Sequence, residues 1–493
     1  MALPEVPLWI NGERRSASDH GTFDVRNPLT KEVVVKSASA TSQDCKAAVE
    51  AAQKALDSWE HTHGVKKRAV FIKAAELLQT DKYKQKIAKL LREETAAADS
   101  WVTVSITGSY TWILETAGLC TQIKGETYPS VTGPGGHVLV QRRAHGVILS
   151  IAPWNAPINL SFRAILIPLA CGNTVVLKSS EFSPASQEIV VELMHEAGLP
   201  PGVLNYVSMS RETSPALTTE LIGHPFVRHV NFTGSDRVGR LIAQEAAKYL
   251  KPCVFELGGK APAVVLEDAD IEAAARCIAD GALANSGQVC MSTERVIVQR
   301  GAVSSLLPAL QKHFQRIRAG DTYAQSGGGA RIPPLINEGS AESVLNLLRE
   351  AQGEGAEILV GDLKRDGAVL NPHIVSGIRP GMRAFDRESF GPVVGVTTVD
   401  TVEEAVELAN TTDYSLTASV WTRDIVRGLE VAPRIRAGLV SINGSTYHGE
   451  PGWVHAGLGG ATGYGKFDIE NFTYKRAIVV HPAQGTYPLV DNP

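Results

Sequence analysis

The sequence predicts an α/β protein built on parallel sheets, with helices crossing between the strands. The chain has 493 residues, more than a single hydrophobic core usually holds, so two or three domains are expected. From residue 146 to residue 250, short apolar segments alternate with longer segments of helical periodicity. A second alternating series begins near residue 258. Repeated strand, helix and strand units are typical of a parallel sheet, and the first series predicts a nucleotide-binding fold.

The first series follows two amphipathic segments. Residues 45–59 and residues 68–94 are each predicted to form one helix, because their apolar residues recur at helical spacing. The expected elements that follow are a strand at 146–153, a helix at 162–172, a strand at 173–180, a helix at 184–198, strands at 202–208 and 227–235, and a helix at 236–250.

The second series predicts another set of strands and helices. Its glycine-rich stretch QSGGGARIPP (325–334) is predicted to be a loop. The expected elements are strands at 261–267 and 295–299, helices at 270–286 and 401–412, and strands at 415–422 and 438–443.

Two further segments have the pattern of projecting strands. GHVLVQRRA (136–144) alternates in polarity, and KRAIVVHP (475–482) is an apolar segment near the end of the sequence. Exposed strands of this kind invite pairing with another subunit, which suits a homodimer or a homotetramer. The alternative is that each strand pairs within its own chain.

The composition argues against several classes of protein. The net charge is −4 and no basic block is present, so neither nucleic acid nor an anionic membrane is an expected partner. No signal peptide and no apolar run of about 18 residues is recognisable. The six cysteines are scattered, without a CxxC pair or zinc spacing. This pattern predicts no metal site, reduced thiols and a cytoplasmic location.

Cys290 stands out because it follows a flexible Ser-Gly-Gln run in NSGQVCMS (285–292). A catalytic cysteine needs a thiolate, a base and a group that stabilises an oxyanion. Glu256, in FELGGK, precedes a Gly-Gly bend, and burial between Phe255 and Leu257 would raise the pKa of its carboxyl into the range of a base that activates water. A surface glutamate beside a turn is the alternative, and this motif alone favours it.

Asn155 lies between two prolines in APWNAP (152–157) at the end of a predicted strand. Proline restricts the backbone on both sides, so the side-chain N–H would be held rigidly, as an oxyanion hole requires. An Asx turn explains the same pattern.

Candidate cofactor residues also follow predicted strands. The chain has no GxxxxGK[ST], and no GxGxxG follows a predicted strand. In FTGSDRVG, Gly234 and Gly239 open a helix that could hold a pyrophosphate, although a helix-capping turn explains the motif equally well. In LKSSE, Lys178 and Glu181 lie where parallel sheets bind ligands, and a glutamate there can accept from ribose hydroxyls and repel a 2′-phosphate.

Together these motifs resemble the aldehyde dehydrogenases. PWN, KSSE, FTGS, ELGGK, GQVC and ESFGP follow in the order and spacing of that family, and the resemblance runs from PLWINGE to NFTYKR. It implies a Rossmann-type NAD domain, an α/β catalytic domain and a β oligomerisation arm. The implied boundaries are 1–124 and 145–257 for the NAD-binding domain, 258–473 for the catalytic domain, and 125–144 and 474–493 for the arm.

The resemblance also implies a role for each matching residue. Cys290 matches the nucleophile that forms a thiohemiacetal and then a thioester, Glu256 the general base, and Asn155 the amide that holds the oxyanion. The residues implied to bind NAD are Lys178 and Glu181 at the adenosine ribose, Gly234 and Ser235 under the pyrophosphate, Glu388 and Phe390 at the nicotinamide ribose and ring, and Trp154.

The implied substrate is an aromatic aldehyde of the salicylaldehyde or vanillin type. Ala156 leaves room for a flat ring, and Trp101 could stack on it. Arg163 could reach an ortho-hydroxyl or could only pack and pair with a carboxylate. The residues assigned to this pocket are Trp101, Ala156, Arg163, Met291 and Tyr447.

One motif departs from the family. Where PFGG is usual, this chain reads HAGLGGATGYG (455–465), and the loop at 445–457 is longer than in the bacterial salicylaldehyde enzymes, so His448 and Trp453 could alter specificity. Two alternatives stay open. A succinic semialdehyde or aliphatic aldehyde dehydrogenase would require a cationic pocket for the distal carboxylate, and Arg163 is the only candidate cation. A non-enzymatic structural role is disfavoured by the presence of all three catalytic residues.

Overall fold

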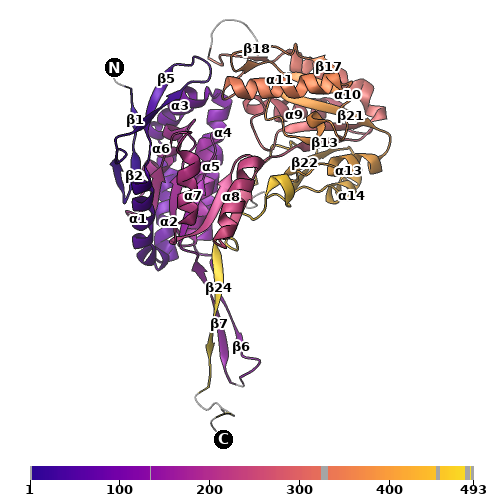
Figure 1. The fold of residues 1–493 in the computed structure, drawn as a ribbon. Coiled ribbons are helices and arrows are strands. Elements are labelled where there is room, and N and C mark those ends of the chain that lie inside the picture. The colour runs from indigo at the N-terminus through magenta and orange to yellow at the C-terminus, as the bar shows by residue number, and fades with distance from the viewer. Residues whose placement is uncertain (1–2, 134, 324–330, 451–455, 483–488, 490–493) are drawn as a thin grey trace.

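The computed structural model describes residues 3–133, 135–323, 331–450, 456–482 and 489, and it consists of two lobes and a projecting arm (Figure 1). Each lobe is built around a seven-stranded sheet, and the arm is a three-stranded sheet. Within the described ranges, no helix has the length and apolar character needed to cross a membrane.

The first lobe contains the predicted alternating series. Five parallel strands form most of its sheet, and two antiparallel strands extend one edge, in the order β12-β11-β8-β9-β10-β2-β3. These strands are β12 (Cys253–Glu256), β11 (Val227–Thr233), β8 (Val147–Ile151), β9 (Thr174–Lys178), β10 (Leu204–Val207), β2 (Leu8–Ile10) and β3 (Glu13–Arg15). The helices of this part of the chain are α1 (Ser42–Glu60), α5 (Pro157–Ala170), α6 (Pro184–Glu196), α7 (Ser214–Gly223) and α8 (Asp236–Lys248). Every residue of β8 and β9 is buried, as expected when helices cover both faces of a parallel sheet.

The N-terminal part of this lobe adds elements outside the predicted series. A small sheet has the order β1-β5-β4, and three helices follow α1. The single helix predicted at 68–94 is wrong, because the polar run Gln79–Thr80 ends one helix and Asp81 begins the next. The elements are β1 (Glu5–Val6), β4 (Thr22–Arg26), β5 (Val33–Ala38), α2 (Gly64–Leu78), α3 (Asp81–Thr95) and α4 (Asp99–Leu119).

The second lobe has the sheet order β17-β20-β21-β14-β13-β22-β23, with only β17 antiparallel to its neighbour. Its strands are β13 (Ala261–Val265), β14 (Thr293–Gln299), β17 (Glu357–Val360), β20 (His373–Ser376), β21 (Val393–Val399), β22 (Thr417–Trp421) and β23 (Leu439–Ile442). Its helices are α9 (Ile271–Leu283), α10 (Arg300–Gln315), α11 (Glu338–Gly353), α12 (Arg383–Asp386), α13 (Val402–Asn410) and α14 (Ile425–Val431). Two short pairs, β15 (Arg318–Ala319) with β16 (Arg331–Ile332) and β18 (Arg365–Asp366) with β19 (Val369–Leu370), complete it.

Two expectations for this lobe need correction. The predicted helix at 270–286 ends at Leu283, and the chain continues as a 3-10 turn, Ala284–Gly287, in which Asn285 and Ser286 have positive φ angles of 48° and 60°. Most of the loop predicted at 325–334 lies outside the described residues, but residues 331–332 form strand β16.

The arm joins the two projecting segments to each other. β7 (His137–Ala144) and β24 (Thr473–Val480) pair antiparallel along their full lengths, and β6 (Glu126–Pro129) pairs with the other edge of β7. The predicted strands therefore pair within the chain, and the arm projects away from both lobes (Figure 1). Association through the arm, like the domain boundaries, stays a prediction.

Candidate active site

Four candidate residues of the first lobe lie at or just after the carboxyl ends of parallel strands, whereas Trp101 lies in α4 and Arg163 in α5. Asn155 follows β8, Lys178 ends β9, Gly234 follows β11 and Glu256 ends β12. The chain order runs in opposite directions on the two sides of β8, and ligands bind at such a switch point in open α/β sheets. The strand order therefore brings these separated motifs to one edge of the sheet.

The second lobe supplies its candidates from the amino ends of its strands. Gly259 precedes β13, Cys290 precedes β14 and Phe390 precedes β21, and these three strands are parallel neighbours. The chain passes directly from β12 to β13 through residues 257–260, so the FELGGK motif joins the two sheets. The site thus lies where the carboxyl edge of one sheet meets the amino edge of the other.

One cavity of about 350 Å³ contains the predicted chemistry. Its lining includes all three predicted catalytic residues, Asn155, Glu256 and Cys290, and all five predicted substrate residues, Trp101, Ala156, Arg163, Met291 and Tyr447. Residues from both lobes therefore surround a single space large enough for a small organic ligand.

Cys290 and Glu256 face each other within this cavity. Sγ of Cys290 donates a hydrogen bond to Oε1 of Glu256 over 4.0 Å. The Glu256 side chain is not on the surface, because the residue is only 2% exposed. Burial raises the pKa of the Glu256 carboxyl, as predicted, and Arg163 partly offsets the rise. Burial and the Glu256 carboxylate raise the pKa of the Cys290 thiol, so the sulfur is held as a thiol in the free protein.

Arg163 pairs with Glu256, which is one of the two alternatives that the sequence left open, and contact with a substrate hydroxyl stays a prediction. Its Nη1 forms a buried ion pair with Oε2 of Glu256, and its Nη2 donates to Oγ1 of Thr233 at 2.9 Å. The guanidinium also lies 4.9 Å from the ring centre of Phe467. The positive charge of Arg163 is therefore neutralised inside the protein, although its side chain also borders the cavity.

Asn155 is held by long-range hydrogen bonds rather than by a local Asx turn. The side-chain Nδ2 of Asn155 donates to the backbone carbonyl of Gln288 at 3.0 Å. The backbone carbonyl of Asn155 accepts from Nε1 of Trp101 at 2.9 Å and from Nδ2 of Asn285 at 3.2 Å. A side-chain amide nitrogen carries two protons, so one N–H remains beyond the bond to Gln288. The amide is both fixed and capable of donating.

Aromatic rings form one wall of the cavity. The ring centres of Trp101 and Tyr447 are 5.8 Å apart with planes inclined by 36°. Trp101 is 5% exposed and anchored through Asn155, so its ring is fixed. Ala156 and Met291 pack against the same apolar cluster. Aromatic rings pack well against other aromatic rings at this kind of spacing.

The glycines of FELGGK allow close packing around Glu388. The N–H of Gly259 donates to Oε1 of Glu388 at 2.9 Å, and a Cβ at Gly258 would lie 2.6 Å from Oε2 of the same carboxyl. A Cβ at Gly259 would overlap the carbonyl oxygen of Cys290. Burial and the neighbouring Glu294 raise the pKa of Glu388 to about 8. The two glycines thus allow the backbone to pack closely against other parts of the protein.

Glu294 is a positioning residue that the sequence reasoning missed. Its buried carboxylate accepts from the N–H groups of Ser389 and Phe390, at 2.9 and 3.2 Å, and pairs with Lys260 Nζ at 2.5 Å. It therefore holds the ESFGP loop, in which Phe390 has a φ of 50°. Lys260 ends the FELGGK motif and Glu294 follows NSGQVCMS, but no spacing in the sequence indicated a contact between the two side chains.

The remaining cofactor candidates are held by local contacts near the ends of the strands that precede them. Trp154 packs edge-on against Phe390, with ring centres 5.8 Å apart, and against Phe182 at 6.2 Å. Ser235 caps α8 by accepting from the N–H of Val238, so this helix N-terminus begins beside Gly234. Lys178 is buried, and burial lowers the pKa of its ammonium.

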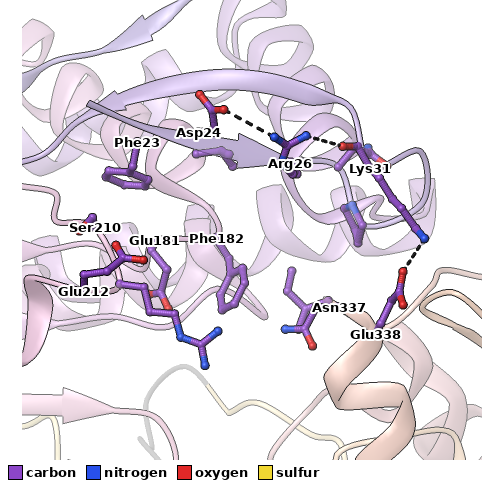
Figure 2. A pocket seen from close by; sticks show the side chains of 15 residues that line it. Phe23, Asp24, Arg26, Lys31, Glu181, Phe182, Ser210, Glu212, Asn337 and Glu338 are labelled. Carbon is purple, nitrogen blue, oxygen red and sulfur yellow. Dashed lines mark hydrogen bonds and ion pairs between the residues drawn. The ribbon is translucent and has the colours of Figure 1, made fainter. Parts of the chain in front are cut away.

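Glu181 lies in a second cavity of about 510 Å³, between the first lobe and the start of α11 (Figure 2). Across this cavity Lys31 forms an ion pair with Glu338, which joins the two lobes. Within the described part of the chain, no hydrogen bond or ion pair engages the Glu181 carboxylate, so it can accept from a ligand's hydroxyls. The unpartnered Glu181 carboxylate, the N-terminus of α8 beside Gly234 and the aromatic pair of Trp154 and Phe390 fit the parts of a dinucleotide.

The loop expected to alter specificity is only partly described. His448 lies at the cavity, and its Nε2 is 3.4 Å from Glu450. Trp453, with residues 451–455, lies outside the described residues.

The model of the aldehyde dehydrogenase family matches residues 15–478. The chain belongs to the aldehyde dehydrogenase family. It is therefore an enzyme that oxidises aldehydes, and the family and the α/β fold expected from the sequence are confirmed.

Among its relatives, the aldehyde dehydrogenase is 41% identical to a vanillin dehydrogenase of Pseudomonas sp. (strain HR199 / DSM 7063), over 98% of this chain and 99% of that protein. Its structure matches that of a salicylaldehyde dehydrogenase from Pseudomonas putida G7 complexed with salicylaldehyde, with a TM-score of 0.93 and 37% identity over 98% of this chain and 100% of that chain. An NADP-dependent glyceraldehyde-3-phosphate dehydrogenase from Bacillus halodurans C-125, complexed with NADP, matches with a TM-score of 0.89 and 29% identity over 97% and 99%. The family thus uses NAD or NADP.

Proposed function

We propose that this aldehyde dehydrogenase oxidises an aromatic aldehyde, of the salicylaldehyde or vanillin type, to the carboxylic acid with NAD. The observation that carries the proposal is a single cavity in which Cys290, Glu256 and Asn155 meet beside the rings of Trp101 and Tyr447. Ala156 leaves space next to Asn155, as a flat substrate requires. The names of the similar vanillin and salicylaldehyde enzymes support the same substrate class.

The first step uses the contact between Cys290 and Glu256. The thiol proton passes to the Glu256 carboxylate while sulfur adds to the aldehyde carbon, which forms a thiohemiacetal oxyanion. The raised pKa of Glu256 suits it to receive this proton. The free N–H of Asn155 and the backbone N–H of Cys290 stabilise the oxyanion.

The cofactor residues act by binding and orientation. Lys178 and Glu181 hold the adenosine ribose, Gly234 and Ser235 the pyrophosphate, and Glu388, Phe390 and Trp154 the nicotinamide end. When bound, NAD supplies the acceptor for the hydride that leaves the substrate carbon, and the product on Cys290 is a thioester. The Glu181 carboxylate favours NAD over NADP because it repels a 2′-phosphate.

Glu256 acts a second time in the release of product. After losing the first proton to solvent, its carboxylate removes a proton from a water molecule that attacks the thioester. Thioester hydrolysis then frees the carboxylic acid and returns Cys290 as a thiol.

The structure disfavours the alternative of succinic semialdehyde. A distal carboxylate would require an unpaired cation in the pocket, but Arg163 is already paired with Glu256. Among the described residues that line the cavity, Arg163 is the only lysine or arginine.

A substrate panel tests the proposal. Initial rates of NADH formation with salicylaldehyde, vanillin, benzaldehyde and succinic semialdehyde would rank the candidate substrates. An aromatic aldehyde is expected to have the highest kcat/KM, and a clear preference for succinic semialdehyde would overturn the proposal. Cys290→Ala should abolish NADH formation, whereas the matched control Cys277→Ala, outside the cavity, should retain it.

A further inference from the structure

Asn159 is a polar side chain in the cavity to which no role has been assigned. It lies one helical turn before Arg163, so these two side chains share one face of α5, and Asn155 lies in the loop just before this helix. Asn159 lines the cavity and is 9% exposed. Its position places it between the proposed oxyanion donor and the cation that pairs with Glu256.

Of the two polar atoms in the Asn159 amide, only the nitrogen has a hydrogen-bond partner among the described residues. Its Nδ2 donates to the carbonyl of Val104 in α4 at 3.5 Å, while its Oδ1 is buried and has no hydrogen-bond partner among the described residues. A buried acceptor without a donor costs free energy, so such a group in a native site calls for an explanation. The amide oxygen requires a donor that the protein itself does not supply.

The facing helix makes room for this amide. A Cβ at Gly108 would lie 2.6 Å from Asn159 Nδ2, closer than a neighbouring side chain tolerates. Glycine is unfavourable inside a helix, and Gly108 lies in the middle of α4. The loss of helix stability caused by Gly108 is explained if the Asn159 amide has to occupy this position.

Nearby hydroxyl groups are already engaged. Thr107 donates to the carbonyl of Thr103 at 2.9 Å, and Thr111 donates to that of Thr107 at 3.0 Å. Each hydroxyl has a single proton, so neither can donate to Asn159 while these bonds last. The missing donor must therefore come from the contents of the cavity.

We propose that Asn159 is a specificity-determining residue that accepts a hydrogen bond from a hydroxyl on the substrate ring. The inference rests on the proposed oxidation of aromatic aldehydes and narrows the class to hydroxybenzaldehydes. A ring without a hydroxyl leaves Oδ1 unpaired, whereas a ring with a suitably placed hydroxyl supplies its donor, so the site discriminates between them.

The test compares kcat/KM for benzaldehyde with that for 2-, 3- and 4-hydroxybenzaldehyde in the wild-type enzyme and in Asn159→Leu. Leucine has the same branching of heavy atoms as asparagine and lacks the acceptor. The preference for at least one hydroxybenzaldehyde over benzaldehyde should fall about 3- to 12-fold in the variant, as expected for one neutral hydrogen bond. A ratio of rates within one protein is insensitive to a loss of folded enzyme.

Two further variants make the test decisive. Ser109→Ala lies on the same helix outside the cavity and should leave the preference unchanged. Gly108→Ala retains Asn159 but displaces its amide, so it should reduce the preference in the same direction and replaces Asn159→Leu if that variant does not fold. Unchanged preferences for all three isomers would overturn the role of Asn159. A wild-type enzyme that oxidises only aliphatic aldehydes would instead overturn the proposed function.

Discussion

Oε1 of Glu256 lies 4.0 Å from Sγ of Cys290, although the two residues belong to different sheets. The same carboxyl is paired on its other oxygen with Arg163. The base is thus placed between the nucleophile and a buried cation, and the cation partly offsets the rise that burial causes in the pKa of the carboxyl. This arrangement leads to the first two predictions below.

Replacing Glu256 by glutamine should impair both halves of the reaction. The amide can neither accept the thiol proton nor activate water, so the rate of the first NADH formation should fall and steady-state turnover should fall about 10²–10⁴-fold. Stopped-flow absorbance of NADH measures both phases. Steady-state turnover equal to that of the wild type would contradict the assignment of Glu256 as the base.

Replacing Arg163 by leucine should move the pH dependence of the reaction. Only the ionised Glu256 accepts a proton, so activity should rise as the pH passes the pKa of this carboxyl, which burial holds above its usual value. Loss of the Arg163 cation removes the stabilisation of the carboxylate, and the acid limb should shift to a pH about 1–3 higher. The pH profile of kcat/KM is the measurement, and Arg163→Lys should restore part of the shift. A limb that does not move would show that Arg163 does not set the pKa of Glu256.

Asn155→Ala should lower kcat about 10²–10³-fold with little change in the KM for NAD, because one oxyanion donor is lost. The matched control is Asn285→Gly, which removes the hydrogen bond to the Asn155 carbonyl, tolerates the φ of 48° at this position and should cost far less. Initial-rate kinetics of both variants provide the comparison. Equal losses would indicate that Asn155 acts through the backbone of its loop rather than through its amide.

Glu181→Gln should improve the use of NADP relative to NAD. The substitution removes the carboxylate that repels a 2′-phosphate, and Arg211, which lines the same cavity, can then attract it. The ratio of kcat/KM for NADP to that for NAD should rise at least about 10-fold. Glu212→Gln changes the same charge elsewhere in the cavity and should have a smaller effect. If the two variants behave alike, overall charge rather than the position of Glu181 determines the preference.

Local patterns in the sequence predicted the alternating elements and most of the site. Apolar periodicity located β8, β9 and α6, and the motifs around Asn155, Glu256 and Cys290 contain the residues that line the cavity. These features depend on neighbours in the chain, such as a helical repeat or a glycine after a strand. The break at Gln79–Thr80 was missed because the apolar repeat continues across it.

By itself, the sequence determined the α/β class, the order of the motifs and the membership of the aldehyde dehydrogenase family. Only the tertiary structure decided that Arg163 pairs with Glu256, that Glu294 holds the Phe390 loop, and that Asn159 faces the cavity opposite Gly108. The partners in these contacts are separated by between 51 and 96 residues in the chain. Such contacts arise from the order of strands in two sheets and from the packing of helices on them, which periodicity along the chain does not encode.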